Sequence, residues 1–363
     1  MPDLAHQLRA LCHQLGFAHV RFADGAGAPG ISAYDLMLAE GRHADMAWMQ
    51  SSRDARADPR LVFRRTESVI VLGMEYGGLR PPDPGGLTGR VATYAWGRDY
   101  HNLIGKRIRK IERWLREQDV PCFGGVDSRP WIERAWAERA GLGFAAKNCC
   151  TIRPGRGSTF FLAVIAVGAK LPVDPPLGGG KERFCGSCAR CHVACPTQAF
   201  VGDGQLDAAR CISYLTIEND GPIPEELRAP LGRWVFGCDD CQDVCPHNHA
   251  TVPTAEEDLG PVNAWLDLRW IMLADDDLVE RQFEGSPLRR PGAVGLKRNA
   301  AVVLGNLGDE AAGPCLDEGL RHPSPLVRGH AAWALRRIEA ASHARHDHAG
   351  PRWSAPAGAF IDR

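Results

Sequence analysis

Two hydrophobic patterns alternate along the first 170 residues. Leucines recur every three or four positions over residues 4–15, and isoleucines do so within residues 101–118, so both segments are predicted to be amphipathic helices. Residues 68–74 (SVIVLGM) and 160–167 (FFLAVIAV) are short continuous apolar runs, which favour buried strands. Helices and strands that alternate in this way predict an α/β sheet domain covered by helices.

The pattern changes after this first region. Residues 171–180 (LPVDPPLGGG) have the composition of a loop. Farther on, KRNAAVVL recurs approximately as RGHAAWAL 31 residues later, a period close to that of helical-pair repeats, although two ordinary surface helices are the alternative. We therefore expect an α/β domain over 1–172, a second domain over 173–255 and helical repeats over 256–340.

The last segment, 341–363, has no apolar period and is predicted to be a disordered tail. Its histidines are expected to be solvated rather than bound to a metal. They are His343, His346 and His348.

Composition restricts the function of this 363-residue chain. A formal charge of −1 and a pI of about 6.9 exclude a generally basic nucleic-acid coat, although a local basic patch is compatible with them. No export signal and no apolar run of the ~18 residues needed for a membrane span are found. The 13 cysteines are therefore expected to stay reduced in the cytoplasm. We expect a cytoplasmic monomer.

Eight cysteines between residues 185 and 245 carry the clearest chemical signal. One block is Cys185, Cys188, Cys191 and Cys195, followed by Pro196; the other is Cys238, Cys241 and Cys245, followed by Pro246, with Cys211 between them. The first block has the spacing of bacterial ferredoxins, in which three cysteines hold one [4Fe–4S] cluster and the fourth serves the other cluster. Two zinc sites are the alternative, but the run of four and the Cys-Pro endings favour clusters.

In the ferredoxin arrangement the last cysteine of each block binds the cluster that is held by the other block. We call this exchange the crossing, and it assigns every ligand. Cluster one takes Cys185, Cys188, Cys191 and Cys245. Cluster two takes Cys195, Cys211, Cys238 and Cys241. Eight thiolates complete two clusters, so the segment is predicted to transfer electrons.

The first domain must contain whatever receives these electrons. Neither a G-x-G-x-x-G fingerprint nor a phosphate-binding loop is present, so nucleotide chemistry finds no support. Asp127 precedes a predicted helix, and a capping role is its simplest interpretation. Cys149 and Cys150 are adjacent, which suits buried thiols better than joint ligation of one tetrahedral metal.

Several short stretches occur together with the cysteine blocks. They are WGRDYH (96–101), VDS (126–128), Glu133, AGLGF (140–144), Lys147-Asn148 and the sequence that follows Cys211. In this combination and order the chain resembles the epoxyqueuosine reductase family. The resemblance covers nearly the whole chain up to the predicted tail.

The resemblance implies a nitroreductase-like domain that holds cobalamin, a ferredoxin-like two-cluster domain and HEAT-like helical repeats. It implies that Asp127 is a proton donor beside the cobalt. It places at or beside the cobalamin pocket Arg56, Asn148, Cys149, Cys150, Thr151, Leu162 and Ser213. Cys150 and Thr151 depart from the apolar residues expected there.

The segment from Asp99 to Gly105 nearly reproduces the D-x-H-x-x-G motif that supplies a cobalt ligand in other cobalamin enzymes. It is one residue too long. His101 also lies at the start of a predicted helix, and we interpret it as structural.

The resemblance further implies a reaction: two electrons and two protons convert the epoxide of epoxyqueuosine, at the wobble position of tRNA, to an alkene and water. A ferredoxin- or flavodoxin-like protein is the expected electron donor. Burial in a largely apolar pocket is expected to raise the pKa of Asp127 and keep it protonated.

Basic residues in the predicted repeat helices are expected to contact tRNA phosphates. Those assigned to this contact are Lys297, Arg298 and Arg328, near Arg289, Arg290, Arg336 and Arg337. A solvated helix face is the alternative for these charges. Two functions compete with the one implied: a reductive dehalogenase, and an electron carrier without catalytic activity that binds nucleic acid.

Overall fold

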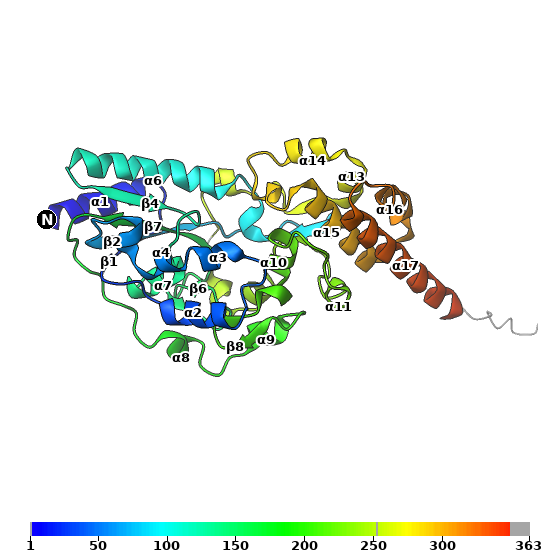
Figure 1. Cartoon of the computed structure of the whole chain (residues 1–363), viewed down its shortest axis with the longest axis horizontal. Coiled ribbons are helices and arrows are strands. Elements are labelled where there is room, and N and C mark those ends of the chain that lie inside the picture. The colour runs from blue at the N-terminus through cyan, green and yellow to red at the C-terminus, as the bar shows by residue number, and fades with distance from the viewer. Residues whose placement is uncertain (1, 252, 349–363) are drawn as a thin grey trace, which may run out of the picture.

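The computed structural model describes residues 2–251 and 253–348 (Figure 1). Its N-terminal part is built on a four-stranded sheet in the order β1-β2-β7-β4, in which all neighbouring strands are antiparallel. The strands are β1 (His19–Asp24), β2 (Ser68–Glu75), β4 (Cys122–Gly125) and β7 (Phe160–Val167). The two predicted strands, 68–74 and 160–167, are confirmed as the central pair of this sheet.

Helices cover both faces of the sheet because alternate strand residues point to opposite sides. On one face lie α1 (Pro2–Gln14) and α6 (Tyr100–Glu117), whose buried Leu8 and Ile104 belong to the same core as Ile70 of β2. On the other face α7 (Glu133–Arg139) buries Trp136 against residues of β2 and β7. The predicted helices at 4–15 and 101–118 are therefore confirmed.

The cysteine-rich segment is woven into the rest of the chain. Its strand β10 (Trp234–Phe236) pairs parallel with β3 (Thr88–Val91), and β11 (Trp265–Asp267) pairs antiparallel with the other side of β3. This three-stranded sheet joins all three predicted domains, and one continuous core runs from Leu87 to Ile338. The short helices of the cysteine-rich segment are α8 (Gly180–Phe184), α9 (Arg190–Ala194), α10 (Ile212–Ile217), α11 (Glu225–Arg228) and α12 (Asp240–Asp243).

The C-terminal part is helical, as predicted, and lies at the opposite end of the molecule from the four-stranded sheet (Figure 1). It contains α13 (Leu268–Leu273), α14 (Asp276–Gln282), α15 (Gly292–Leu307), α16 (Gly313–Gly319) and α17 (Pro325–His348). The two copies of the predicted repeat lie in α15 and α17. These helices pack closely at Gly305, where a Cβ atom would come within 2.8 Å of the Cα of Ala334.

The predicted start of the tail is wrong, because α17 continues to His348. The rest of the predicted tail, 349–363, lies outside the described residues. The remaining elements are short and surround the sheet or the cysteines: α2 (Ile31–Ala39), α3 (Ala47–Ser51), α4 (Arg53–Ala57), α5 (Pro59–Val62), β5 (Phe144–Ala145), β6 (Thr151–Ile152), β8 (Phe200–Gly202) and β9 (Gln205–Leu206).

Candidate active site

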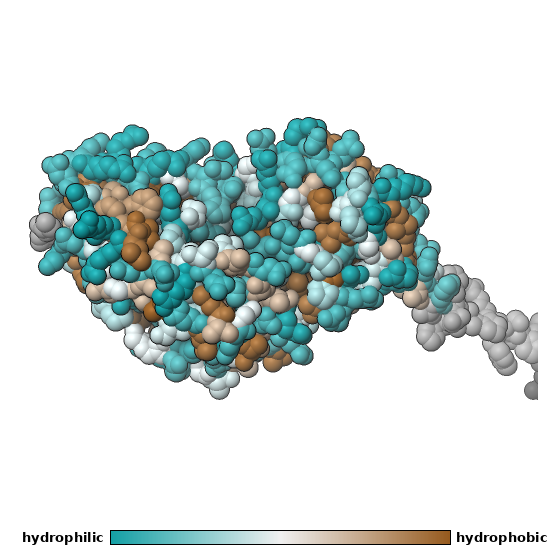
Figure 2. All heavy atoms as spheres, viewed as in Figure 1, coloured by the Kyte–Doolittle hydropathy of each residue, from teal (hydrophilic) through white to brown (hydrophobic). Residues whose placement is uncertain are grey.

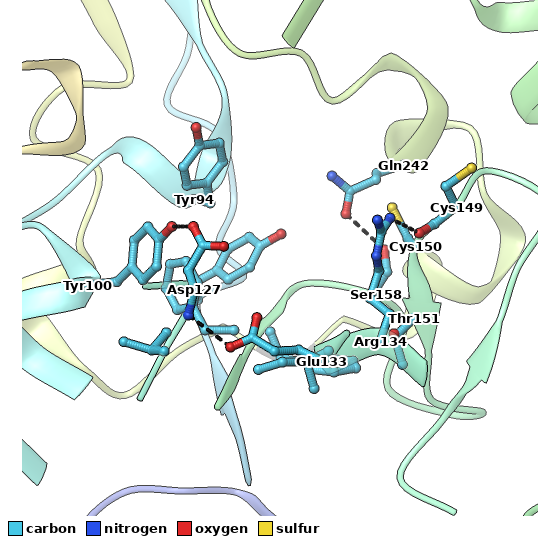
Figure 3. A pocket seen from close by; sticks show the side chains of 15 residues that line it. Tyr94, Tyr100, Asp127, Glu133, Arg134, Cys149, Cys150, Thr151, Ser158 and Gln242 are labelled. Carbon is cyan, nitrogen blue, oxygen red and sulfur yellow. Dashed lines mark hydrogen bonds between the residues drawn. The ribbon is translucent and has the colours of Figure 1, made fainter. Parts of the chain in front are cut away.

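An open cavity of about 360 Å³ lies between the sheet domain and the cysteine-rich segment. Figure 3 shows its labelled side chains in two groups that face each other, with Asp127 and Glu133 in one and Cys150 and Gln242 in the other. Phe160, Phe161 and Leu162 of β7 add an apolar wall. The cavity therefore combines an apolar surface with carboxyl groups at one end and thiols at the other.

Five of the residues predicted for catalysis or cofactor binding line this cavity: Asp127, Cys149, Cys150, Thr151 and Leu162. The other three do not line it. Arg56 instead donates to the carbonyl of Trp131 at 2.7 Å and so anchors the segment between Asp127 and α7. Asn148 donates to the carbonyl of Cys241 at 3.3 Å, and Ser213 lies on α10 beside Cys211.

Asp127 is held in the cavity by its neighbours. It follows β4 with a left-handed φ of 53°, a conformation that non-glycine residues adopt at a cost. Its N–H donates to Oε1 of Glu133 at 2.8 Å, and its Oδ2 accepts from the hydroxyl of Tyr100 at 2.8 Å (Figure 3). Nε2 of His101 lies 3.5 Å from the same oxygen.

The electrostatics of Asp127 correct one prediction. The hydrogen bond with His101 lowers the pKa of Asp127, Tyr100 adds to this effect, and burial opposes it. The expected rise in the pKa of Asp127 by burial is therefore wrong, because its side chain is 62% exposed and has two donors beside it. The carboxyl of Asp127 therefore ionises more readily than that of a free aspartate.

Glu133 is a site residue to which the sequence assigned no role. Burial, assisted by the charge of Asp127, raises the pKa of Glu133 to about 8. Its position as the acceptor for the Asp127 N–H makes it a support for the Asp127 loop. The only sequence signal was its place in the stretch that carries the family resemblance.

The predicted ligands of cluster one meet in the structure. Cys185, Cys188, Cys191 and Cys245 together line a second cavity, of about 280 Å³. The described residues contain no group of three or more Cys, His, Asp or Glu side chains placed around a single metal ion. Four thiols spread around a cavity suit a cluster, which is larger than one ion.

The predicted ligands of cluster two also lie near one another. Burial raises the pKa of Cys211 and Cys238; the nearby Cys195 adds to the rise for Cys211, and the nearby Cys211 adds to the rise for Cys238. The neighbouring Cys150 raises the pKa of Cys241, and Cys150 lines the first cavity. This set of cysteines therefore borders the first cavity.

Two of the three predicted tRNA contacts are wrong. Lys297 and Arg298 lie on α15 with exposures of 3% and 0%, so phosphates cannot reach them. Lys297 pairs with Asp276 at 2.7 Å. Arg298 donates to the main-chain carbonyls of Leu215 and Gly221 at 2.7 and 2.8 Å and thus ties α15 to the cysteine-rich segment. Arg328 is exposed, so its predicted role stays open.

Replacing Arg298 with Met should destabilise the protein. The change leaves buried carbonyls without donors, at a cost of about 3 kcal/mol in the free energy of unfolding. Urea denaturation should therefore show a clearly lower midpoint. The matched control is Arg321→Met, since Arg321 is 71% exposed and its loss should change stability by at most ~0.5 kcal/mol. Equal midpoints for both variants would refute the structural role of Arg298.

Two segments of the chain match family models. Residues 184–248 match a 4Fe-4S double cluster binding domain. Residues 56–128 match the family described as Epoxyqueuosine reductase QueG, DUF1730. The chain is thus an iron–sulfur protein.

The similarity to known proteins extends over most of the chain. It is 40% identical over 351 residues to the epoxyqueuosine reductase of Xanthomonas campestris, covering 92% of this chain and 96% of that protein. For the same enzyme of Escherichia coli, the identity is 36% over 357 residues, covering 92% and 89%. A crystal structure of epoxyqueuosine reductase with an epoxyqueuosine-modified tRNA stem loop is 28% identical and has a TM-score of 0.84, covering 96% and 95%. The chain belongs to the epoxyqueuosine reductase family.

Proposed function

We propose that this protein reduces epoxyqueuosine in tRNA by holding cobalamin in the first cavity, receiving electrons through its two [4Fe–4S] clusters and supplying a proton from Asp127. Family membership assigns the reaction, the conversion of epoxyqueuosine to queuosine at the wobble position, which completes queuosine biosynthesis. It also sets aside the dehalogenase and the electron carrier without catalytic activity. The observation that carries the proposal is the cavity with Asp127 at one end and Cys150, beside Cys241, at the other.

The lining of the first cavity fits cobalamin. A second opening of about 220 Å³ shares Tyr76 and Gln242 with it, so the two cavities are neighbours, and a large cofactor could extend from one toward the other. Leu162 and its neighbours supply an apolar wall for a flat ring. The buried hydroxyl of Thr151 has no hydrogen-bond partner among the described residues and is free to bind a ligand. When bound, reduced cobalamin supplies a strong nucleophile toward an epoxide carbon.

The cysteines provide the route for electrons. Cluster one would be held near the protein surface, where Cys185 and Cys188 are partly exposed, and a ferredoxin- or flavodoxin-like donor could approach it. Cluster two would lie beside Cys150 at the wall of the first cavity. The order donor, cluster one, cluster two and cavity follows from these positions.

Asp127 handles the oxygen of the substrate. Opening an epoxide leaves an alkoxide, which needs an acid within hydrogen-bonding distance. The Asp127 carboxyl faces the cavity and is oriented by Tyr100. The lowered pKa favours the ionised form of Asp127. The proton for the alkoxide must therefore come from the groups that are hydrogen-bonded to Asp127.

The tRNA contact moves from the buried basic residues to exposed ones near the cavity. Arg290 is 61% exposed, pairs with Glu218 at 3.0 Å and acts electrostatically on Asp127. An anticodon loop whose modified base enters the cavity would place phosphates along this rim. Arg328 remains a proposed contact farther away on α17.

Replacing Arg290 with Glu should therefore weaken tRNA binding. We expect the affinity to fall at low salt and the salt dependence of binding to become shallower, since one phosphate contact is lost. Filter binding across a salt series measures both quantities. Arg321→Glu, at an exposed site in the C-terminal helices, is the control. An unchanged salt slope in Arg290→Glu would exclude this contact.

The proposed cofactor site is tested by titrating the reconstituted protein anaerobically with cobalamin and following the corrinoid absorption spectrum. Saturable binding is expected, and it should be lost when Leu162 is replaced by Trp, which fills the cavity. Leu61→Trp changes an exposed leucine and should bind like the wild type. Equal binding by both variants would place the cofactor elsewhere.

The other expectations concern the surface and remain predictions. No described helix is long and apolar enough to cross a bilayer. The face in Figure 2 is largely hydrophilic, with apolar residues in small patches. A cytoplasmic monomer stays our proposal, as do the nitroreductase-like and HEAT-like descriptions of the domains.

A further inference from the structure

Asp99, His101 and Asp127 form a continuous chain of polar groups that ends in the cavity. Asp99 caps α6, and its Oδ1 lies 2.8 Å from Nδ1 of His101. The other ring nitrogen, Nε2, lies 3.5 Å from Oδ2 of Asp127. The imidazole thus joins a carboxylate outside the cavity to the one proposed to protonate the substrate.

The surroundings of His101 favour its protonated form. Burial lowers the pKa of His101, but hydrogen bonds with Asp127 and Asp99 outweigh this effect and raise it to about 9. The ring of Tyr100 stacks on the imidazole at 4.1 Å. Glu133 and the cation Arg290 act on the same group of residues through Asp127 and Tyr100. The imidazole is therefore a proton carrier at neutral pH.

We propose that His101 is a positioning residue that reloads Asp127 with the protons consumed by epoxide reduction. This role rests on the proposed function, and it differs from both a purely structural role and a cobalt ligand. Each turnover consumes two protons, whereas Asp127 can hold one. A donor connected to Asp127 would supply the second proton.

The proton transfer balances without any further reactant. As the alkoxide forms on the substrate, it takes a proton through the Asp127 carboxyl, and Nε2–H of His101 supplies that proton to the Asp127 carboxylate. The imidazole becomes neutral and keeps Nδ1–H, which still donates to Asp99. Solvent then returns a proton to Nε2.

Access from solvent supports this direction of transfer. The His101 side chain is 40% exposed in the free protein. A bound cofactor and tRNA loop would cover the Asp127 carboxyl, which faces the cavity. Protons would then reach Asp127 by way of the imidazole.

The kinetic test compares His101→Gln with the wild type under single-turnover conditions, at saturating tRNA and cobalamin. Glutamine keeps a donor toward Asp127 but cannot release a proton. The rate of reduction by the wild type should fall as the pH rises through about 9, where His101 loses its proton. This fall is the alkaline limb of its pH–rate profile. The variant should be at least ~100-fold slower, the lower end of general-acid contributions, and should lack this limb.

Two further variants separate proton transfer from structure. Asp99→Asn should move the limb to lower pH, because one of the two carboxylates that raise the pKa of His101 is removed. His101→Ala should regain rate when imidazole is added. His322→Gln removes an imidazole that pairs with Asp276 in the C-terminal part, and it should keep the wild-type profile. A His101→Gln enzyme with the wild-type rate and limb would overturn the proposal.

A measurement without turnover keeps this test separate from the proposed function. NMR of the labelled histidines should show one imidazole, absent in His101→Gln, that titrates near pH 9. Its pKa should fall in Asp127→Asn. Titration of His101 at its ordinary value, about 6.5, would refute the relay whether or not epoxyqueuosine is reduced. Failure of the wild type to reduce epoxyqueuosine, with His101 titrating near pH 9, would refute the proposed function alone.

Discussion

Replacing Asp127 with Asn should remove epoxyqueuosine reduction while leaving both clusters and the cofactor in place. Asparagine tolerates the left-handed backbone of this position and can still accept from Tyr100, so the loop should keep its conformation. It cannot donate an acidic proton to the alkoxide. The expected loss in single-turnover rate is about 10²- to 10⁴-fold, the usual contribution of a general acid.

The control for this variant is Asp119→Asn. Asp119 is also an aspartate with a left-handed φ, 57°, but it lies just after α6 and does not line the first cavity. Iron content and the corrinoid spectrum should match the wild type in both variants. If Asp127→Asn reduces epoxyqueuosine at the wild-type rate, Asp127 is not the proton donor.

Replacing Cys245 with Ala should abolish turnover by removing cluster one. The crossing predicts that Cys245 serves the same cluster as Cys185, with which it lines the second cavity. Iron per chain should therefore fall by half in Cys245→Ala. The single-turnover rate with a protein electron donor should fall below detection, because the entry point for electrons is lost.

Double variants test the crossing itself. Adding Cys185→Ala to Cys245→Ala should cost no further iron, whereas adding Cys238→Ala should remove nearly all of it. Cys315→Ala, a buried cysteine in α16, is the control with full iron content. The crossing would be refuted if Cys245 and Cys238 behaved as members of one cluster.

The sequence predicted the parts of the fold that have strong periodic signals. Strands β2 and β7 are long apolar runs, and α6 has a buried stripe that includes Ile104, Ile108 and Ile111. The sheet formed by β3, β10 and β11 escaped prediction, because strands of three or four residues carry too little periodicity. The spacing of Cys185, Cys188 and Cys191 predicted that these thiols lie together, and the structure places all three around the second cavity.

The errors arose where distant residues determine the environment. Arg298 looks like a surface charge in the sequence, but its guanidinium meets carbonyls 77 and 83 positions away in the chain. The pKa of Asp127 depends on Tyr100, 27 positions earlier. Neither contact leaves a local pattern.

The most direct test of the account is an anaerobic assay of the reconstituted protein with tRNA that carries epoxyqueuosine. Nucleoside mass spectrometry should show the loss of one oxygen atom when reductant and cobalamin are both present, and no loss when cobalamin is omitted. Conversion that proceeds equally well without cobalamin, or no conversion with clusters and corrinoid bound, would contradict the account.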